Sequence, residues 1–522
     1  MRNGAVTLSY SILAEIPGDP QGMTTKAALL LVFVPVVFAQ SDSRLVEAPR
    51  VWNDRDLRDW ATPVAGLNVR PGHYSEKEYY SAPVGEYVRT YPVYFPGQEP
   101  AGYWDMIRNK KPEPLIRPGA RTPEQWLTEG RRIFHELDLP YLRNYDAEVI
   151  ELVRSVEECK KLGGHAQKDG TILGFRWVPT STGLALGHQD CAACHSRVMP
   201  DGSIIDGAPG PGADRGSGLT RVAKFVTHDS HSFLDFFSPG ETKNQVFWRW
   251  WAAPWVPGDI NDTVKSPSRR GEDIAGLGRG VLPRFNGSPF YPTKTPDMIA
   301  VKDRKHIDHT ATHLLRGPED LMRYAALVSC CDSADFGEYH MLTEKGRRIL
   351  YRFPDELLYA LAQYIYSLQP PANPNLKDPY AAAGRKIFER ERCGNCHTAP
   401  AYTNNKLTIA EGFTPAPDHP LREDILPISV ATDPGLALKT RKGTGLYKIP
   451  SLRGVWYRGY YGHDGSVTTL EEWFDPARLR DDYVPSGFKG YKITHRAVPG
   501  HQFGLALTAE DKASLIAFLK TL

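Results

Sequence analysis

The chain has 522 residues, and its 41% hydrophobic and 24% charged residues are ordinary for a globular protein. A net charge of +2 indicates neither a nucleic acid nor a strongly acidic partner. The length allows two or three domains, and 46 glycines with 43 prolines predict many ordered loops around a mainly α regular structure.

The first predicted element is a secretory signal peptide within residues 1–39. Met23 marks its start, Lys26 supplies the positive charge, and an apolar stretch leads to a small-residue cleavage pattern ending at Ala39. A membrane anchor is the alternative, but the apolar run has about 12 residues and a bilayer span needs about 20. We therefore expect a mature chain that starts near Gln40, is periplasmic or secreted, and has no membrane span.

Two similar segments further along the chain predict a repeated helix. Residues 122–134 and 378–388 each open with a helix-start signal, Thr-Pro or Asp-Pro, and each carries the sequence Gly-Arg-x-Ile-Phe. Apolar residues at helical spacing also predict helices at 355–368 and 510–522. The Pro- and Asn-rich linker 369–375 separates the two helix pairs, so the chain is expected to contain two related halves.

Each half contains one copy of the pentapeptide Cys-x-x-Cys-His. The first copy consists of Cys191, Cys194 and His195, and the second of Cys393, Cys396 and His397. Two thiols at this spacing reach the two vinyl groups of a haem, and the following His lies under the iron. A thioredoxin-like pair does not need the His, and a zinc site brings its cysteine pairs close together in sequence. The motifs therefore predict two covalently bound c-type haems.

These motifs and helices divide the chain into four expected parts. The signal region at 1–39 is followed by an extended, Tyr- and Pro-rich N-terminal arm at 40–120, a c-type cytochrome domain at 121–370, and a second c-type cytochrome domain at 371–522. The first domain carries an insertion, because many more residues separate the helix from the haem motif there than in the second domain. The arm has weak periodicity and is expected to wrap the core rather than fold alone.

Two further groups of residues have more than one interpretation. A cluster of aromatic residues is interpreted as core packing, with an electron relay between the haems as the alternative. Its members are Trp248, Trp250, Trp251 and Trp255. His309 and His313, four residues apart, would suit a metal ion on one helical face, but a solvated or haem-edge role is the main expectation.

Three cysteines lie outside the haem motifs: Cys159, Cys330 and Cys331. In an oxidising compartment a disulfide from Cys159 to one of the two adjacent cysteines is expected, which leaves one thiol. A strained bridge between Cys330 and Cys331 is the alternative, and the sequence does not decide between these two pairings.

Three segments of the second half carry a resemblance to a known family. They are Cys393–His397, Tyr447–Val455 and Tyr460–Glu472, and the last two include Pro-Ser-Leu-Arg and His-Asp-Gly. On these residues the chain resembles the bacterial di-haem cytochrome c peroxidases, a superfamily that includes the methylamine dehydrogenase maturase. The first half matches only in its haem motif and flanking helices. The long spacing between the two haem motifs is similar to that of the more distantly related rubber oxygenases.

The resemblance implies an oxidoreductase in which the haem at His195 meets peroxide or dioxygen and the haem at His397 passes electrons. A small redox protein would donate these electrons, and Arg453 would pair with a haem propionate. In the compact peroxidases a His shortly after the haem motif is a distal ligand, and the corresponding residues 210–212 of this chain contain no His. The distal side of the first haem is therefore expected to be open, unless the insertion supplies His228, His231 or His309, and no side chain is assigned to catalysis. The alternatives are a haem-dependent oxygenase acting on an apolar substrate and an electron-transfer cytochrome without catalysis.

The second haem is expected to be bis-histidine, with His501 as its distal ligand. The family places a Met at the position of Ala477, which cannot bind iron, and no Met follows in this part of the chain. His463 matches a residue of the family that is not a ligand. Of the remaining candidates, His501 is favoured over His495, because Gly500 and the proline before it allow a turn that folds back over the iron.

Overall fold

The computed structural model describes most of the chain after residue 43. The described residues are 44–140, 143, 147–157, 167–210, 253–256, 280–282, 288, 290–342, 347–491 and 493–522. Residues 43–522 form one compact unit. The expected signal peptide, with its cleavage site after Ala39, lies outside the described residues. No helix in the described ranges combines the length and the apolar character needed to cross a bilayer.

The expectation of a mainly α protein is wrong. Helices make up 30% and strands 15% of the described residues. One antiparallel sheet has the order β1-β2-β3, with β1 at Tyr91–Tyr94, β2 at Thr171–Thr180 and β3 at Gly183–His188. Strand β2 is buried on both faces and contains Gly174, so it lacks the apolar alternation by which a strand is identified in a sequence.

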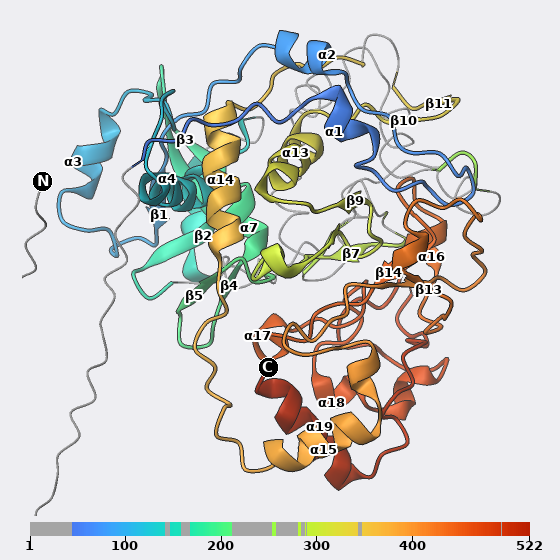
Figure 1. Cartoon of the computed structure of the whole chain (residues 1–522). Helices are drawn as coiled ribbons and strands as arrows, with labels where there is room; N and C mark the ends of the chain where they lie inside the picture. The colour runs from blue at the N-terminus through green and yellow to red at the C-terminus, as the bar shows by residue number, and fades with distance from the viewer. Residues whose placement is uncertain are drawn as a thin grey trace, which may run out of the picture. The chain divides into compact units, whose positions relative to one another are not determined.

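Each half of the chain contains a pair of packed helices. In the first half α4 (Pro123–Glu136) packs against α14 (Asp355–Ser367), and in the second α15 (Ala381–Arg390) packs against α19 (Ala509–Lys520) (Figure 1). These are the four helices that the repeat and the apolar spacing predict. The Thr122 hydroxyl accepts from the backbone N–H of Gln125 and Pro123 occupies the first turn, which explains why α4 begins where it does.

A glycine lies at each helix contact. Gly130 of α4 faces the carbonyl of Ala360 in α14, and Gly384 of α15 faces the carbonyl of Ser514 in α19. A Cβ atom at either glycine would fall inside the van der Waals radius of that oxygen, so glycine permits the close approach of the two helices. The Ile-Phe pairs that follow fill the interfaces, and all four side chains are buried: Ile133, Phe134, Ile387 and Phe388.

The segment 44–120 contributes to the core of the first half. Trp52 and Trp60 are buried in the same apolar cluster as side chains of α4, α13 (Pro318–Ser329) and α14. The Trp60 indole N–H donates to the carbonyl of Leu314, 3.0 Å away. The short helices α1 (Asp54–Arg58) and α2 (Glu76–Ser81) belong to this segment (Figure 1). The segment therefore packs onto later parts of the chain.

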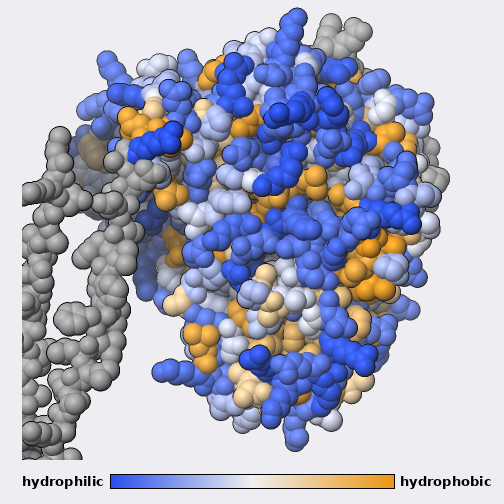
Figure 2. Space-filling model, viewed as in Figure 1, coloured by the Kyte–Doolittle hydropathy of each residue, from blue (hydrophilic) through white to orange (hydrophobic). Residues whose placement is uncertain are grey.

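The remaining elements are short. They are α3 (Tyr103–Arg108), α5 (Ala147–Arg154), α7 (Cys191–His195), α16 (Gly435–Leu438), α17 (Val455–Arg458), α18 (Leu470–Trp473), the 3-10 helices η2 (Val301–Asp303), η3 (Cys393–Asn395), η4 (Arg422–Asp424) and η5 (Pro476–Leu479), and the strands β4 (Ser196–Val198), β5 (Ile204–Asp206), β6 (Val281–Leu282), β7 (Thr293–Lys294), β8 (His306–Ile307), β9 (His313–Leu314), β10 (Asp335–Phe336), β11 (Tyr339–His340), β12 (Leu407–Ile409), β13 (Ile425–Leu426) and β14 (Leu446–Lys448). Strand β12 pairs parallel with β13 and antiparallel with β14. Hydrophilic side chains cover most of the face in Figure 2, with smaller hydrophobic patches between them.

Candidate haem sites

The first Cys-x-x-Cys-His segment forms the short helix α7, closely following β3. One helical turn separates Cys191 from Cys194, and both side chains are partly exposed, whereas His195 is buried. The Nδ1–H of His195 donates to the carbonyl of Pro296, 3.1 Å away. That hydrogen bond fixes the ring and leaves Nε2 to bind a metal, which is how a metal-ligating imidazole is ordinarily held.

The second segment, which begins in η3 just after α15, repeats this arrangement. The Nδ1–H of His397 donates to the carbonyl of Pro450 at 3.1 Å, and the Tyr402 carbonyl lies 3.3 Å away. Burial lowers the pKa of His397, so its ring is neutral at pH 7 and keeps a lone pair on Nε2. Cys393 and Cys396 are partly exposed. Each motif therefore offers two accessible thiols and one oriented imidazole, which is the donor set that a c-type haem requires.

The two prolines belong to a repeat that the sequence analysis missed in the first half. Lys294–Pro296 and Lys448–Pro450 both read Lys-x-Pro, and each begins at the end of a strand, β7 or β14. Pro296 lies 101 residues after His195, whereas Pro450 lies only 53 residues after His397. The longer first interval hides the match, and the shared Lys-x-Pro is the signal that would have revealed it.

Five cationic side chains gather where these two Lys-x-Pro segments meet: Lys294, Arg304, Lys448, Arg453 and Arg458. Their ion-pair partners are Asp297, which lies 2.7 Å from Arg458, and Asp303. Burial lowers the pKa of Lys294 to about 8 and that of Lys448 to about 7. Asp308 and Asp464 also act on Lys448 and Lys294, and the propionates of a haem would add negative charge beside these cations.

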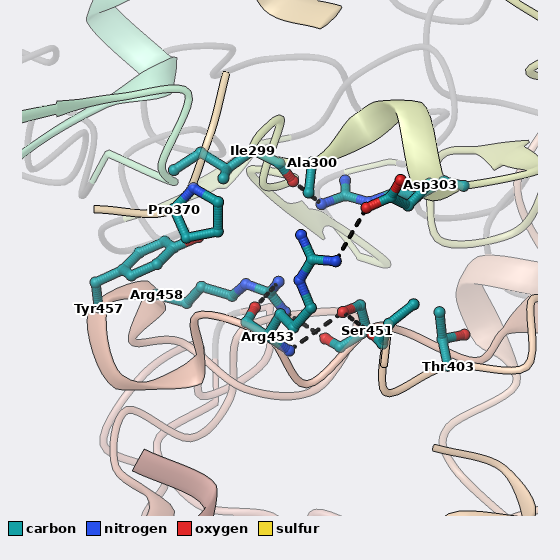
Figure 3. A pocket seen from close by; sticks show the side chains of 11 residues that line it. Ile299, Ala300, Asp303, Pro370, Thr403, Ser451, Arg453, Tyr457 and Arg458 are labelled. Atoms are coloured by element: carbon teal, nitrogen blue, oxygen red, sulfur yellow. Dashed lines mark hydrogen bonds and ion pairs between the residues drawn. The ribbon is translucent and has the colours of Figure 1, made fainter. Parts of the chain in front are cut away.

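A small pocket opens beside Arg453 (Figure 3). Ile299, from the segment after the first proline, and Ser451 and Tyr457, from the segment after the second, contribute to its wall. Within it the Arg453 guanidinium donates to the Asp303 carboxylate at 3.0 Å. Arg453 therefore lies between the segments that hold the two proximal histidines, and its pairing with a propionate stays a prediction.

The structure brings His501 close to His397 and leaves His495 exposed. The ring centroids of His397 and His501 are 6.4 Å apart. A metal–imidazole bond of about 2.0 Å, plus roughly 1.1 Å to the ring centre, places two imidazoles on opposite sides of one metal with centroids about 6.2 Å apart. Burial lowers the pKa of His501 to about 4, so the ring is a neutral base. The spacing and the charge state both suit bis-histidine ligation.

The other candidate residues have structural partners. Trp255 packs against Phe336, with ring centroids 5.1 Å apart. The Nε2–H of His309 donates to the Lys294 carbonyl at 3.2 Å, and His313 is buried. The alternative of a shared helical face for His309 and His313 is wrong, because they lie in a turn and in β9. Trp248, Trp250 and Trp251 lie outside the described residues.

Cys330 and Cys331 lie at the end of α13. Their sulfur atoms are 2.7 Å apart, and Cys331 is completely buried. Burial raises the pKa of the Cys331 thiol well above its usual value. Cys159, the other expected partner, lies outside the described residues. In the described part of the chain, these two thiols are therefore each other's nearest candidates for pairing.

We predict that protein purified without reductant carries a bridge between Cys330 and Cys331, because their sulfur atoms lie 2.7 Å apart and disulfides form under oxidising conditions. Denaturation in an alkylating reagent should leave both unlabelled, and their peptide should be lighter by the mass of two hydrogens. Reduction should then admit two labels. A peptide that joins Cys159 to either residue would contradict this pairing.

Solved structures with a weak likeness to this chain include the following two, whereas no protein-family model and no curated protein matches it. A MauG-like protein associated with microbial copper homeostasis is 25% identical over 32% of this chain and 56% of its own, with a TM-score of 0.21. Kuenenia stuttgartiensis hydrazine synthase is 16% identical over 55% of this chain and 89% of its own, with a TM-score of 0.26. The first match spans little more than half of that protein, and TM-scores this low carry no argument about function.

Proposed function

We propose that this chain is an exported di-haem c-type cytochrome that reduces peroxide at the haem held by His195, with electrons delivered through the haem held by His397. The main support is the pair of histidine rings at the second site. Each proximal His donates to a proline carbonyl, and at the second site the ring centroid of His501 also lies 6.4 Å from that of His397. A haem with two imidazole ligands has no position free for a small molecule, which assigns the reaction to the other haem.

The chain around the first haem motif supports an open distal side. In the compact peroxidases the ligand His lies in the region that corresponds to residues 210–212 of this chain, which contain no His. The Gly210 N–H donates to the carbonyl of Cys194 at 2.9 Å, and a Cβ would crowd the carbonyl of Ser196. Backbone therefore packs directly against the haem motif at this position.

Bound haem would supply the redox chemistry, in which two electrons and two protons convert one peroxide into two waters. The chain's own residues would hold and orient the two haems. The carbonyls of Pro296 and Pro450 fix the proximal rings, and the buried cations, Arg453 among them, pair with propionates. A small redox protein would donate the electrons one at a time.

A haem-dependent oxygenase acting on an apolar substrate is the second candidate. It is favoured by the interval of 101 residues between His195 and Pro296, against 53 residues for the second haem. The longer interval occurs in the first half of the sequence only, and its additional residues would supply a binding surface that a small peroxide molecule does not need.

The absorption and EPR spectra of the purified protein are expected to show one low-spin haem, held by His397 and His501, and one high-spin haem, for which an open position is proposed. With a reduced cytochrome as donor, each peroxide consumed should oxidise two donor molecules. Two low-spin haems without peroxide turnover would instead support an electron carrier. Oxygen consumption with an apolar substrate, without peroxide turnover, would support the oxygenase.

A further inference from the structure

We propose that Arg478 is a positioning residue that fixes the His501 ring over His397. The proposal rests on the proposed function, in which His501 is the distal ligand of the second haem. Arg478 lies in η5 and is completely buried, and its guanidinium reaches the loop that carries His501.

The guanidinium of Arg478 binds the backbone of this loop. Its Nη1 donates to the Val498 carbonyl at 2.5 Å, and its Nη2 donates to the carbonyls of Gly500 and His501 at 2.8 and 3.0 Å. The Val498 N–H donates in return to the Arg478 carbonyl at 2.7 Å. A further bond, from Nε to the Trp473 carbonyl at 2.8 Å, holds the guanidinium itself in place. Arg478 thus holds the backbone on both sides of the peptide bond between Gly500 and His501.

All four of these acceptors are backbone carbonyls, and no carboxylate among the described residues pairs with Arg478. A buried guanidinium is costly unless its N–H groups are satisfied, and the carbonyls satisfy most of them. Burial lowers the pKa of Arg478, as expected for a charge that is buried without a counter-ion. A neutral side chain would fill this space at lower cost, so the arginine points to a geometric task.

The backbone that Arg478 binds has an unusual conformation. Gly500 has a φ of +83° and His501 a φ of +45°, so two consecutive residues are left-handed. This conformation is unfavourable for a residue with a Cβ, and it needs support from its surroundings. The two bonds from Nη2 go to the carbonyls of these two residues, which is where that support is required.

The Nδ1 atom of His501 is buried and has no hydrogen-bond partner among the described residues, whereas Nδ1 of His397 donates to a proline carbonyl. A metal-ligating imidazole is ordinarily oriented by such a bond. For His501 the orientation comes from the backbone that Arg478 holds and from the rings of Trp473 and Phe503, whose centroids lie 5.5 and 5.3 Å away.

The test compares the haem-loaded Arg478→Met variant with Arg480→Ala. Arg480 is a matched control, because it lies two residues away, pairs with Asp482 and has a side chain that is 68% exposed. Arg478→Met is expected to lose at least half of the low-spin EPR signal of the second haem, and added imidazole should restore it by binding the vacated position. Arg480→Ala should keep the wild-type spectrum. A wild-type low-spin signal in Arg478→Met overturns the proposal.

Two further variants separate the ways in which the proposal can fail. Arg478→Lys keeps the charge but reaches fewer carbonyls, so an intermediate loss is expected. This variant decides the question if Arg478→Met does not accumulate, and a wild-type signal in it then overturns the proposal. If His501→Ala leaves the second haem low-spin, the ligand assignment of the proposed function fails as well. If His501→Ala loses the signal and Arg478→Met keeps it, only the positioning role fails.

Discussion

The His501→Ala variant is expected to convert the haem at His397 from a low-spin to a high-spin form. The two rings stand at the separation that a shared iron requires, and alanine leaves nothing to occupy the sixth position. The change should approach one full haem equivalent, because among the described residues His501 is the one histidine whose ring lies beside that of His397. Absorption and EPR spectra measure it, with the signal of the haem at His195 unchanged.

The His495→Ala variant is the matched control for this experiment. His495 is in the same segment, six residues earlier, but its side chain is exposed and bonds only to Thr494 among the described residues. Its removal should leave both haem spectra unaltered. A high-spin conversion by His495→Ala would move the ligand assignment to that residue. If neither variant changes the spectrum, bis-histidine ligation is wrong.

The Gly384→Ala variant is expected to destabilise the second half by about 3 kcal/mol, because a Cβ there collides with the Ser514 carbonyl of α19. The sign of the change in the free energy of unfolding distinguishes two effects. In the middle of an isolated helix the same change stabilises by about 1 kcal/mol, since alanine has the higher helix propensity. Helix packing and helix propensity therefore predict opposite outcomes. Denaturant unfolding followed by circular dichroism measures the difference.

Lys386→Ala provides the control for Gly384→Ala, because Lys386 is on the exposed side of the same helix α15. It should change the free energy of unfolding by less than about 0.5 kcal/mol. Gly130→Ala should repeat the large loss in the first half, where the Cβ would meet the Ala360 carbonyl. Stabilisation by Gly384→Ala would show that α15 and α19 are not in close contact in solution.

The helices were predictable because their signals are local. Thr122 and the proline after it mark the start of α4, and the Gly-Arg-x-Ile-Phe sequence gives the buried side of both first helices. The strands were not predictable, which is why the expected mainly α class is wrong. Strand β1 comes from the N-terminal segment and pairs with β2. Because β2 is buried on both faces, its sequence shows neither the alternation of a half-buried strand nor the spacing of an amphipathic helix.

The candidate site was predictable where chemistry fixes the spacing and hidden where only the fold does. The cysteines of each motif must lie one helical turn apart, so the motifs can be recognised from the sequence without a structure. Pro296 lies 101 residues after His195, so only the short Lys-x-Pro sequence that it shares with the second half could have indicated its place beside His195. Arg478 was missed for a similar reason, because all its partners are backbone carbonyls and any sequence supplies those.

The carbonyls of Pro296 and Pro450, which accept from the two proximal histidines, would affect electron transfer between two bound haems. His195 and His397 each donate Nδ1–H at 3.1 Å to a proline carbonyl, so these two bonds would act on the two haems in the same sense. A difference in reduction potential would then depend on other contacts. At the second haem an imidazole from His501 would lower the potential relative to a thioether, and the buried charge of Arg478 would raise it. The difference in reduction potential that drives electron transfer would therefore depend on the distal side of the second haem. Substitutions there would change this difference without affecting haem attachment.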